Sequence, residues 1–538
     1  MVGKKGKVSA CKYQDVLGKC PRPVWEGGGP EEKYCLFHSM QMEKKSEEFL
    51  EEIKHIKKGE PSELYKMGQR EGYDCGDFGG FRFPSGAGYF AGHKFEGDVY
   101  FSMSIFEGNA DFTSAEIGGY AIFSYAKIDG YAIFFDAKIG GFASFSHAKI
   151  DGDAIFSSAK IDGYAIFFDA EIGGDASFFD AEIDGDASFS SAKIDGDAIF
   201  FDAKIGGYAS SSSAKIGGYA SFSSAKIGDD ASFLNTKIEK SLILSGAKCG
   251  SDVILDQAQM KSLNANGLKY EGLLSLEETL FIEGAEQEPS TVNNVYLERT
   301  KIVRVDLSFF SFRGAFIREV LFDSVSFDKE LPSKWFHIWK HPWVSGRPKE
   351  AICEERQALA EKEKTKKKEH YRSAETVYRT LKHEMEDKHA KGLARRMRAG
   401  ELECKRNEAG VIQWFFLVIY RFLNGFGLRC IRALLFWLIL IFMFACHYTG
   451  SFATYDKYEQ KLQLQAGRFE KVERIRPELK VVDFGDGLLH SIQMTSVVMK
   501  PSLTIHYPDV GWIEFAERIL SPALLLLFLQ AARNMARD

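Results

Sequence analysis

A mainly β solenoid, followed by an α-helical linker and a two-transmembrane-helix domain with a re-entrant pore-like helix, is the fold class that three observations predict. Residues 97–239 repeat with a period of 11 residues. Residues 350–408 are highly charged and contain few glycines and prolines, and two apolar segments lie near the end of the chain. We therefore expect a Cys/His module at 1–45, a helical connector and cap at 46–80, a β-helix at 81–330, a charged helical linker at 331–410 and a membrane domain at 411–538.

The repeat follows the pattern G-[YD]-A-x-F-x-x-A-[KE]-I-[GD], of which residues 130–140 are a typical unit. In this unit Ala132, Phe134, Ala137 and Ile139 alternate with polar or variable positions, as on a strand with one buried face. Each unit therefore predicts two very short strands joined by tight corners, with Phe and Ile pointing inward. We expect the glycine at a corner, where a positive φ costs it least.

These units resemble the pentapeptide-repeat family in its A-x-F-x-x-A-x-I form. The resemblance implies a right-handed quadrilateral β-helix with two units per coil, hence about 6.5 coils and roughly 31 Å of regular rod at about 4.8 Å per coil. Residues 81–95 are expected to form a cap, and residues 242–327 irregular coils interrupted at 283–294. A packing defect is expected at Ser211, because it interrupts the first of two columns of stacked rings: Phe101, Phe123, Phe145, Phe167 and Phe189 in one, and Phe112, Phe134, Phe156, Phe178 and Phe200 in the other.

The repeat block is acidic, with 22 Asp and Glu against 9 Lys and no Arg. An acidic rod can attract a basic protein partner. The same charge also keeps an exposed sheet surface soluble and unpaired, so a passive rod is the alternative. We expect no nucleic-acid partner.

A Cys/His cluster with spacing C-x8-C-x14-C-x2-H lies near the N-terminus and comprises Cys11, Cys20, Cys35 and His38. Cysteine and histidine are the ligands that structural zinc prefers, and four protein ligands leave no position open for catalysis. The cluster resembles a short Cys/His module found ahead of some pentapeptide-repeat proteins. We expect a structural zinc here, with unrelated cysteines as the alternative.

The two apolar segments predict membrane spans at about 431–453 and 512–532, each long enough to cross a bilayer. Basic residues flank the start of the first and the end of the second. The positive-inside rule then places both the N-terminal bulk and the C-terminus in the cytoplasm, at the inner or cell membrane.

Residues 483–499 are semi-apolar and rich in hydroxyl groups, as in a re-entrant pore helix. Together with the linker motifs at 378–382 and 401–406, this region resembles the two-helix, ion-channel-like membrane domain of many pentapeptide-repeat proteins. The filter-like stretch lacks glycine, so potassium selectivity is not expected. Pro522 is a hinge or a simple bend. Glu514 and Arg518 either line a pore or pair with each other at the interface. The candidate pore residues are Thr495, Ser496, Val497, Val498, Lys500, Glu514, Glu517 and Arg518.

The sequence supports two functional hypotheses. One is a channel-like homo-oligomer, a tetramer by expectation, whose cytoplasmic β-helix is a sensing or docking arm. The other is a non-conducting, membrane-tethered scaffold for protein–protein interaction. We expect no enzyme, because the sequence has no Walker loop, nucleophile elbow or paired-histidine motif.

Overall fold

The computed structural model divides into two compact units, Met1–Asp328 and Lys329–Asp538. Each unit is described by itself. The structure describes residues 12, 14–15, 18–19, 22, 34–39, 42–57, 76–85, 88–282, 289–292, 295–297, 299–307, 310–325, 352–387, 391–424, 430–449, 452–465, 468–494, 503–506, 517, 519–523, 525–526 and 529.

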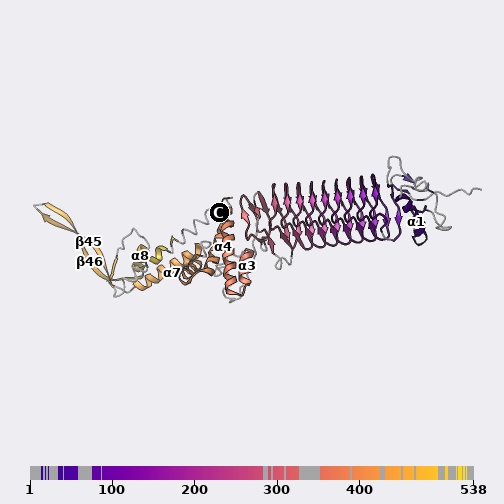
Figure 1. Ribbon diagram of the computed structural model, residues 1–538. Coiled ribbons are helices and arrows are strands. Elements are labelled where there is room, and N and C mark those ends of the chain that lie inside the picture. The colour runs from indigo at the N-terminus through magenta and orange to yellow at the C-terminus, as the bar shows by residue number, and fades with distance from the viewer. Residues whose placement is uncertain are drawn as a thin grey trace, which may run out of the picture. The chain divides into compact units, whose positions relative to one another are not determined.

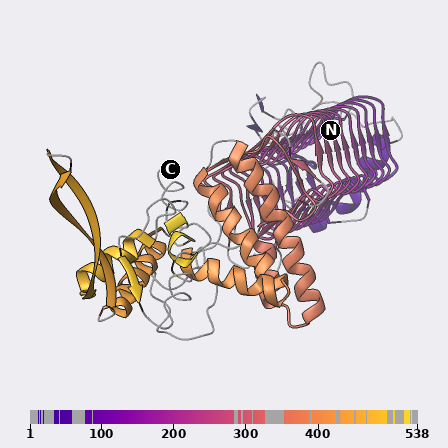
Figure 2. The same cartoon turned by 90° about the vertical axis from the view of Figure 1, so that its left-hand side faces the viewer.

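The first unit is a β-solenoid, a stack of coils whose strands form four parallel sheets (Figure 1). Figure 2, turned by 90° from Figure 1, shows the coils lying over one another as successive loops. Most strands have two residues, because each 11-residue unit forms two sides of the coil and the corners take up the remaining residues. The second unit contains helices and an antiparallel hairpin.

Successive coils add one strand to each sheet. The first sheet, which we call the lysine face, contains β4 (Lys94–Phe95), β8 (Glu116–Ile117), β12 (Lys138–Ile139), β16 (Lys160–Ile161), β20 (Glu182–Ile183), β24 (Lys204–Ile205), β28 (Lys226–Ile227), β32 (Lys248–Cys249) and β36 (Lys269–Tyr270). The second contains β5 (Val99–Tyr100), β9 (Ala121–Ile122), β13 (Ala143–Ser144), β17 (Ala165–Ile166), β21 (Ala187–Ser188), β25 (Ala209–Ser210), β29 (Ala231–Ser232), β33 (Val253–Ile254), β37 (Leu274–Glu277), β41 (Thr300–Val303) and β44 (Leu321–Asp323).

The third sheet contains β3 (Arg82–Phe83), β6 (Ile105–Phe106), β10 (Lys127–Ile128), β14 (Lys149–Ile150), β18 (Glu171–Ile172), β22 (Lys193–Ile194), β26 (Lys215–Ile216), β30 (Lys237–Ile238), β34 (Gln259–Met260) and β38 (Leu280–Phe281). The fourth contains β7 (Ala110–Asp111), β11 (Ala132–Ile133), β15 (Ala154–Ile155), β19 (Ala176–Ser177), β23 (Ala198–Ile199), β27 (Ala220–Ser221), β31 (Ser241–Ile243), β35 (Ser262–Asn264), β39 (Ser290–Thr291) and β42 (Phe310–Ser311). Two short pairs lie outside these sheets: β1 (Gln14–Asp15) with β2 (Gly18–Lys19), and β40 (Tyr296–Leu297) with β43 (Phe316–Ile317).

The stack is therefore longer than the strictly repeated block. The flanking sequences continue the same sheets, and the solenoid has about 10 turns. The predicted interruption also has a physical counterpart: β35 pairs with β39 at a separation of 27 residues, between Asn264 and Thr291, where the regular coils use 22. The extra residues are accommodated between β38 and β39 without ending the sheet.

Phenylalanine rings fill the core as two columns that run along the stack. In the first, which begins at Phe101, ring centroids of successive coils are 4.7 to 5.0 Å apart. In the second, which begins at Phe112, they are 4.5 to 5.0 Å apart as far as Phe222. Between columns the rings meet edge to face, a geometry that aromatic pairs favour. Ser211 lies buried in the first column, between the positions of Phe189 and Phe233.

The corner chemistry differs from the expectation. The repeat glycines do not have positive φ; the left-handed position falls instead on the residue before the second alanine, such as Asp136 (φ 55°) or Ser158 (φ 56°). Asn, Asp and Ser tolerate this conformation because their short side chains bond locally. Glycine suits the corner for a different reason. A Cβ at Gly163, at the position that is glycine in nearly every unit, would lie 2.9 Å from the backbone carbonyl carbon of Gly141 on the preceding coil, so glycine there lets the coils approach closely.

The N-terminal end of the stack is covered by aromatic side chains and by α1 (Met42–Lys57). Phe37 stacks on Phe81 with centroids 4.4 Å apart, and Phe49 of α1 meets Phe83 edge to face at 5.3 Å. These rings close an end that would otherwise expose the core, as solenoids require. Tyr89 is buried in the same cap, and this burial raises its pKa to about 12.

The second unit begins with three packed helices, α3 (Cys353–Ala360), α4 (Lys364–Asp387) and α5 (Lys391–Glu408), followed by α6 (Val411–Asn424) and α7 (Cys430–Tyr448). The segment 452–481 forms two long antiparallel strands, β45 (Phe452–Gln465) and β46 (Arg468–Val481), and β47 (Leu503–His506) pairs with β45. The helix α8 (Phe484–Met494) packs on α7. Within the described ranges, no helix combines the length and the apolar character needed to cross a membrane.

Candidate functional site

The acidic side chains on the rod act largely within the fold. Asp153 accepts a hydrogen bond from the backbone N–H of Asp175 at 2.9 Å, and Asp175 accepts one from Asp197 at 2.7 Å. The same bond recurs at Asp98, Asp186, Asp230 and Asp252, each time to the residue one coil further on. The Asp that varies with Tyr in the repeat is therefore a structural residue that joins successive coils.

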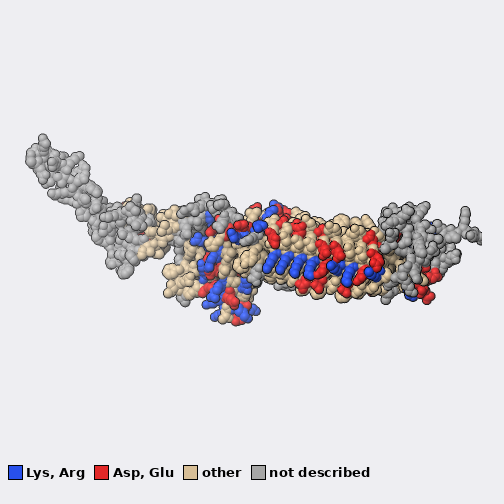
Figure 3. All heavy atoms as spheres, turned by 45° about the horizontal axis from the view of Figure 1, so that its top comes forward, with Lys and Arg blue, Asp and Glu red and all other residues tan. Residues whose placement is uncertain are grey.

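Lysines form in-register columns on two sheets, and Figure 3 shows Lys and Arg gathered in a stripe along the rod. Most of them are neutralised locally. Lys193 lies 2.9 Å from Asp195, and Lys160 lies 3.7 Å from Asp162, two residues along the same coil. A hydrogen bond to Asp195 raises the pKa of Lys193, as expected for a stabilised cation.

Three consecutive coils of the lysine face lack this neutralisation. There the residue two positions after the lysine is glycine, so Lys204, Lys226 and Lys248 lack the Asp that pairs with Lys160 and Lys193. Lys204 bonds instead to Glu182 on the preceding coil, and this hydrogen bond lowers the pKa of the Glu182 carboxyl. Among the described residues, Lys226, Lys248 and the following Lys269 form no ion pair.

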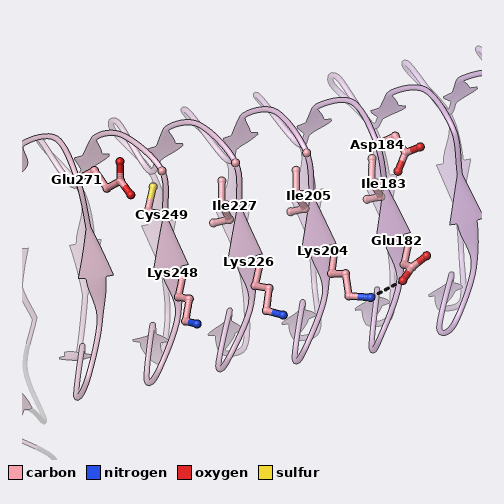
Figure 4. Close-up of a pocket in the computed structure, with 13 residues that line it drawn as sticks. Glu182, Ile183, Asp184, Lys204, Ile205, Lys226, Ile227, Lys248, Cys249 and Glu271 are labelled. Atoms are coloured by element: carbon pink, nitrogen blue, oxygen red, sulfur yellow. Dashed lines mark hydrogen bonds and ion pairs between the residues drawn. The ribbon is translucent and has the colours of Figure 1, made fainter.

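Beside these lysines the surface is hollowed into a groove, shown in Figure 4. Its corner is bare because the glycines carry no side chain, and the lysines line its edge. Asp184 and Glu271 mark its two ends. The groove is lined by Glu182, Ile183, Asp184, Lys204, Ile205, Gly206, Lys226, Ile227, Gly228, Lys248, Cys249, Gly250 and Glu271.

The predicted zinc ligands are only partly described. The structure brings the sulfur of Cys35 to 3.3 Å from Nδ1 of His38, on one buried turn beside Phe81. Cys11 and Cys20 lie outside the described residues. Among the residues that are described, no group of three or more possible ligands gathers around one point.

Most of the predicted pore residues also lie outside the described part of the chain, namely Thr495, Ser496, Val497, Val498, Lys500, Glu514 and Arg518. Glu517 and Pro522 are described. Glu517 is fully buried and accepts hydrogen bonds from the hydroxyls of Tyr448, at 2.7 Å, and Ser491. His490 lies edge to face with the Tyr448 ring at 5.0 Å.

This polar cluster sits inside a helical region whose exterior is apolar. Leu438, Ile439 and Phe442 on α7 are all about half exposed. Ile519 and Leu526, in the C-terminal helical segment, are exposed too. Apolar outside and polar inside is the reverse of the usual arrangement in water-soluble domains.

The two linker motifs meet across α4 and α5. Glu401 contacts Lys405 at 2.8 Å and Lys382 at 3.0 Å. Burial alone would raise the pKa of Glu401, but these two hydrogen-bonded lysines lower it to about 2. Tyr378 is buried, donates to Glu355 at 2.6 Å, and packs where Gly400 leaves room; a Cβ at Gly400 would lie 2.3 Å from the ring. The two motifs therefore stabilise the packing of α4 on α5 and α3.

The four-sheet stack defines a β-solenoid of scaffold-like character. Residues 90–138 match the family model for Pentapeptide repeats (9 copies), so this part of the rod is similar to pentapeptide repeats. Comparison with curated proteins and with solved structures gave no match.

Sequence reasoning named Glu517 as a pore candidate, but it missed the groove and the contacts that Glu517 makes with Tyr448 and Ser491. The groove had a readable signal, because three successive coils of one column read Lys-Ile-Gly, Lys-Ile-Gly and Lys-Cys-Gly, whereas the two coils before them read Lys-Ile-Asp and Glu-Ile-Asp. The polar cluster had none, since Tyr448 and Glu517 are 69 residues apart.

Proposed function

We propose that the protein is a membrane-tethered scaffold: the solenoid presents fixed rows of side chains to a protein partner, and the C-terminal helical unit supplies the tether. The observation that carries the proposal is the lysine face, where identical side chains recur at the strand spacing of about 4.8 Å on a closely packed stack. Such a surface can bind a partner protein through regularly spaced charges, and binding of this kind needs no catalytic group.

The tether is supported by the apolar exteriors of α7 and the C-terminal helical residues. Such exposed apolar surface is rare on soluble monomers and marks contact with lipid or protein. The test is flotation of the purified full chain with liposomes, using Leu438→Lys with Phe442→Lys as the altered pair. The tethered protein is expected to float and the variant to remain in the dense fraction. Floating of neither protein would overturn the tether.

A channel-like homo-oligomer is a second candidate, favoured by the buried Tyr448–Ser491–Glu517 cluster. Buried carboxylates inside apolar helical regions commonly mark ion or proton pathways. The test is the mass of the nanodisc-purified protein, followed by recordings in planar bilayers. A tetramer that carries current supports the channel. A monomer without current contradicts it, because two helices cannot enclose a pathway.

We further propose that structural zinc closes the N-terminal cap, held by Cys35 and His38 together with Cys11 and Cys20. Tetrahedral zinc with one sulfur and one nitrogen ligand places these two atoms about 3.6 Å apart, close to the observed 3.3 Å. Bound metal would add folding energy to a small segment next to the first coils. Elemental analysis of the full chain should find one zinc, lost in Cys35→Ser; a metal-free, folded wild-type protein would contradict this.

A further inference from the structure

Three neighbouring lysines of the lysine face form no ion pair within the described part of the rod. Lys204, Lys226, Lys248 and Lys269 are in register on four adjacent strands, and only Lys204 is ion-paired. Like charges directly opposite each other in a sheet are unfavourable. Elsewhere on the rod, an Asp at the following corner removes this cost, as it does for Lys193.

We infer that the groove beside these lysines binds an acidic α-helix of a partner protein, laid along the rod axis with about one carboxylate per coil. This inference rests on the proposed scaffold function and names the chemistry of its partner. The argument depends on charge complementarity, on spacing and on the bare glycine corner.

The spacing of the lysines fits a helix. Four lysines span three strand intervals, or about 14 Å at about 4.8 Å each. Carboxylates at positions i, i+3, i+7 and i+10 of a helix span about 15 Å at about 1.5 Å per residue. The offsets at the inner positions are about 1 Å, which a flexible lysine side chain accommodates. These four positions also lie on one face of the helix.

The glycine corner makes room for a partner of this size. Gly206, Gly228 and Gly250 carry no side chain at this corner, whereas the two preceding coils carry Asp162 and Asp184 at the same position. No side chain therefore projects from this corner on the coils whose lysines line the groove. Asp184 and Glu271 at the two ends disfavour extension of an anionic partner beyond the groove.

Nucleic acid fits this column less well. A DNA strand winds once around its axis in about 34 Å, so a straight column of about 14 Å meets phosphates only where the strand crosses it. A flat anionic membrane would contact a wider surface, including the whole corner between the lysine face and the next sheet, where Asp229, Asp230 and Asp252 lie. A narrow, straight and acidic partner is the best complement.

The test uses the full chain and a labelled alanine-rich peptide of about 16 residues with glutamates at i, i+3, i+7 and i+10. An isomer of the same composition, with the glutamates distributed around the helix, is the peptide control. Binding is measured by fluorescence anisotropy at low and high salt. The variant is Lys226→Gln with Lys248→Gln, and the matched protein control is Lys160→Gln with Lys193→Gln, which removes the same charge from ion-paired positions.

The one-faced peptide is expected to bind more tightly than its isomer and to lose about five- to tenfold in affinity in the groove variant, with less than about twofold loss in the control variant. Salt should weaken the binding. Equal binding of the two peptides, equal loss in both variants, or no binding would overturn the inference. So would groove-dependent binding of single-stranded DNA or of phosphatidylserine vesicles in place of the peptide. Each of these leaves the flotation result, and hence the tethered scaffold, unaffected.

Discussion

Replacing one inward-facing ring should destabilise the solenoid locally and strongly. Phe167 stacks on Phe145 and Phe189 at 5.0 and 4.8 Å and meets Phe156 and Phe178 edge to face at 5.4 and 5.6 Å. Phe167→Ala removes the buried ring and these contacts, which costs about 4 kcal/mol in a closely packed core. Because each coil contacts only its neighbours, the loss should concentrate in the coils around the substitution.

Hydrogen–deuterium exchange of the full chain measures this loss coil by coil. A decrease of about 4 kcal/mol in the free energy of local opening corresponds to roughly a thousandfold faster exchange in peptides covering residues 143–194. The matched control is Phe168→Ala, which removes the next, outward-facing ring and should change exchange less than about tenfold. Similar effects of the two substitutions, or acceleration spread evenly over the whole rod, would refute the reasoning.

Three further predictions concern the second unit. Glu401 has a folded pKa of about 2 against 4.5, so its contribution of about 3 kcal/mol is fully present above pH 4.5 and disappears as the pH falls toward 2; acid unfolding should be less pH-dependent in Glu401→Gln, and an unchanged pH profile would contradict the ion cluster. Gly400→Ala should lower the stability of the helical unit by about 2 kcal/mol, because the new Cβ meets the Tyr378 ring; an unchanged melting temperature would show that the contact is relaxed easily. Glu517→Leu leaves the hydroxyls of Tyr448 and Ser491 without this acceptor and should cost about 2 kcal/mol in thermal unfolding in nanodiscs, more than Glu517→Gln; equal melting of both variants would argue against the buried hydrogen bonds.

The β-solenoid could be predicted from the sequence because its contacts are local and periodic. Each phenylalanine meets a copy of itself 22 residues away, so the period alone identifies the column that holds Phe123 and Phe145. The corner could not be assigned correctly in this way. The pattern reveals which residues recur but not which one has a positive φ, and the structure gives that conformation to positions such as Asp136 while glycine serves close approach.

The second unit was less accessible because its interactions join distant segments. A helix was expected at 483–499 and α8 occupies Phe484–Met494, but the long hairpin of β45 and β46 was not foreseen. Its strands carry mixed polar and charged residues without the clean alternation that indicates one buried face. The membrane spans and the channel stay predictions, and so does a basic partner for the rod's acidic residues.

Recruitment to liposomes tests the tethered scaffold most directly. Neutral liposomes carrying the reconstituted full chain are mixed with the labelled one-faced acidic peptide and recovered by flotation. The account predicts that the peptide floats in proportion to the protein and that Lys226→Gln with Lys248→Gln abolishes most of this recruitment while the protein still floats. Protein that stays behind, or recruitment that is unchanged in the variant, would contradict it.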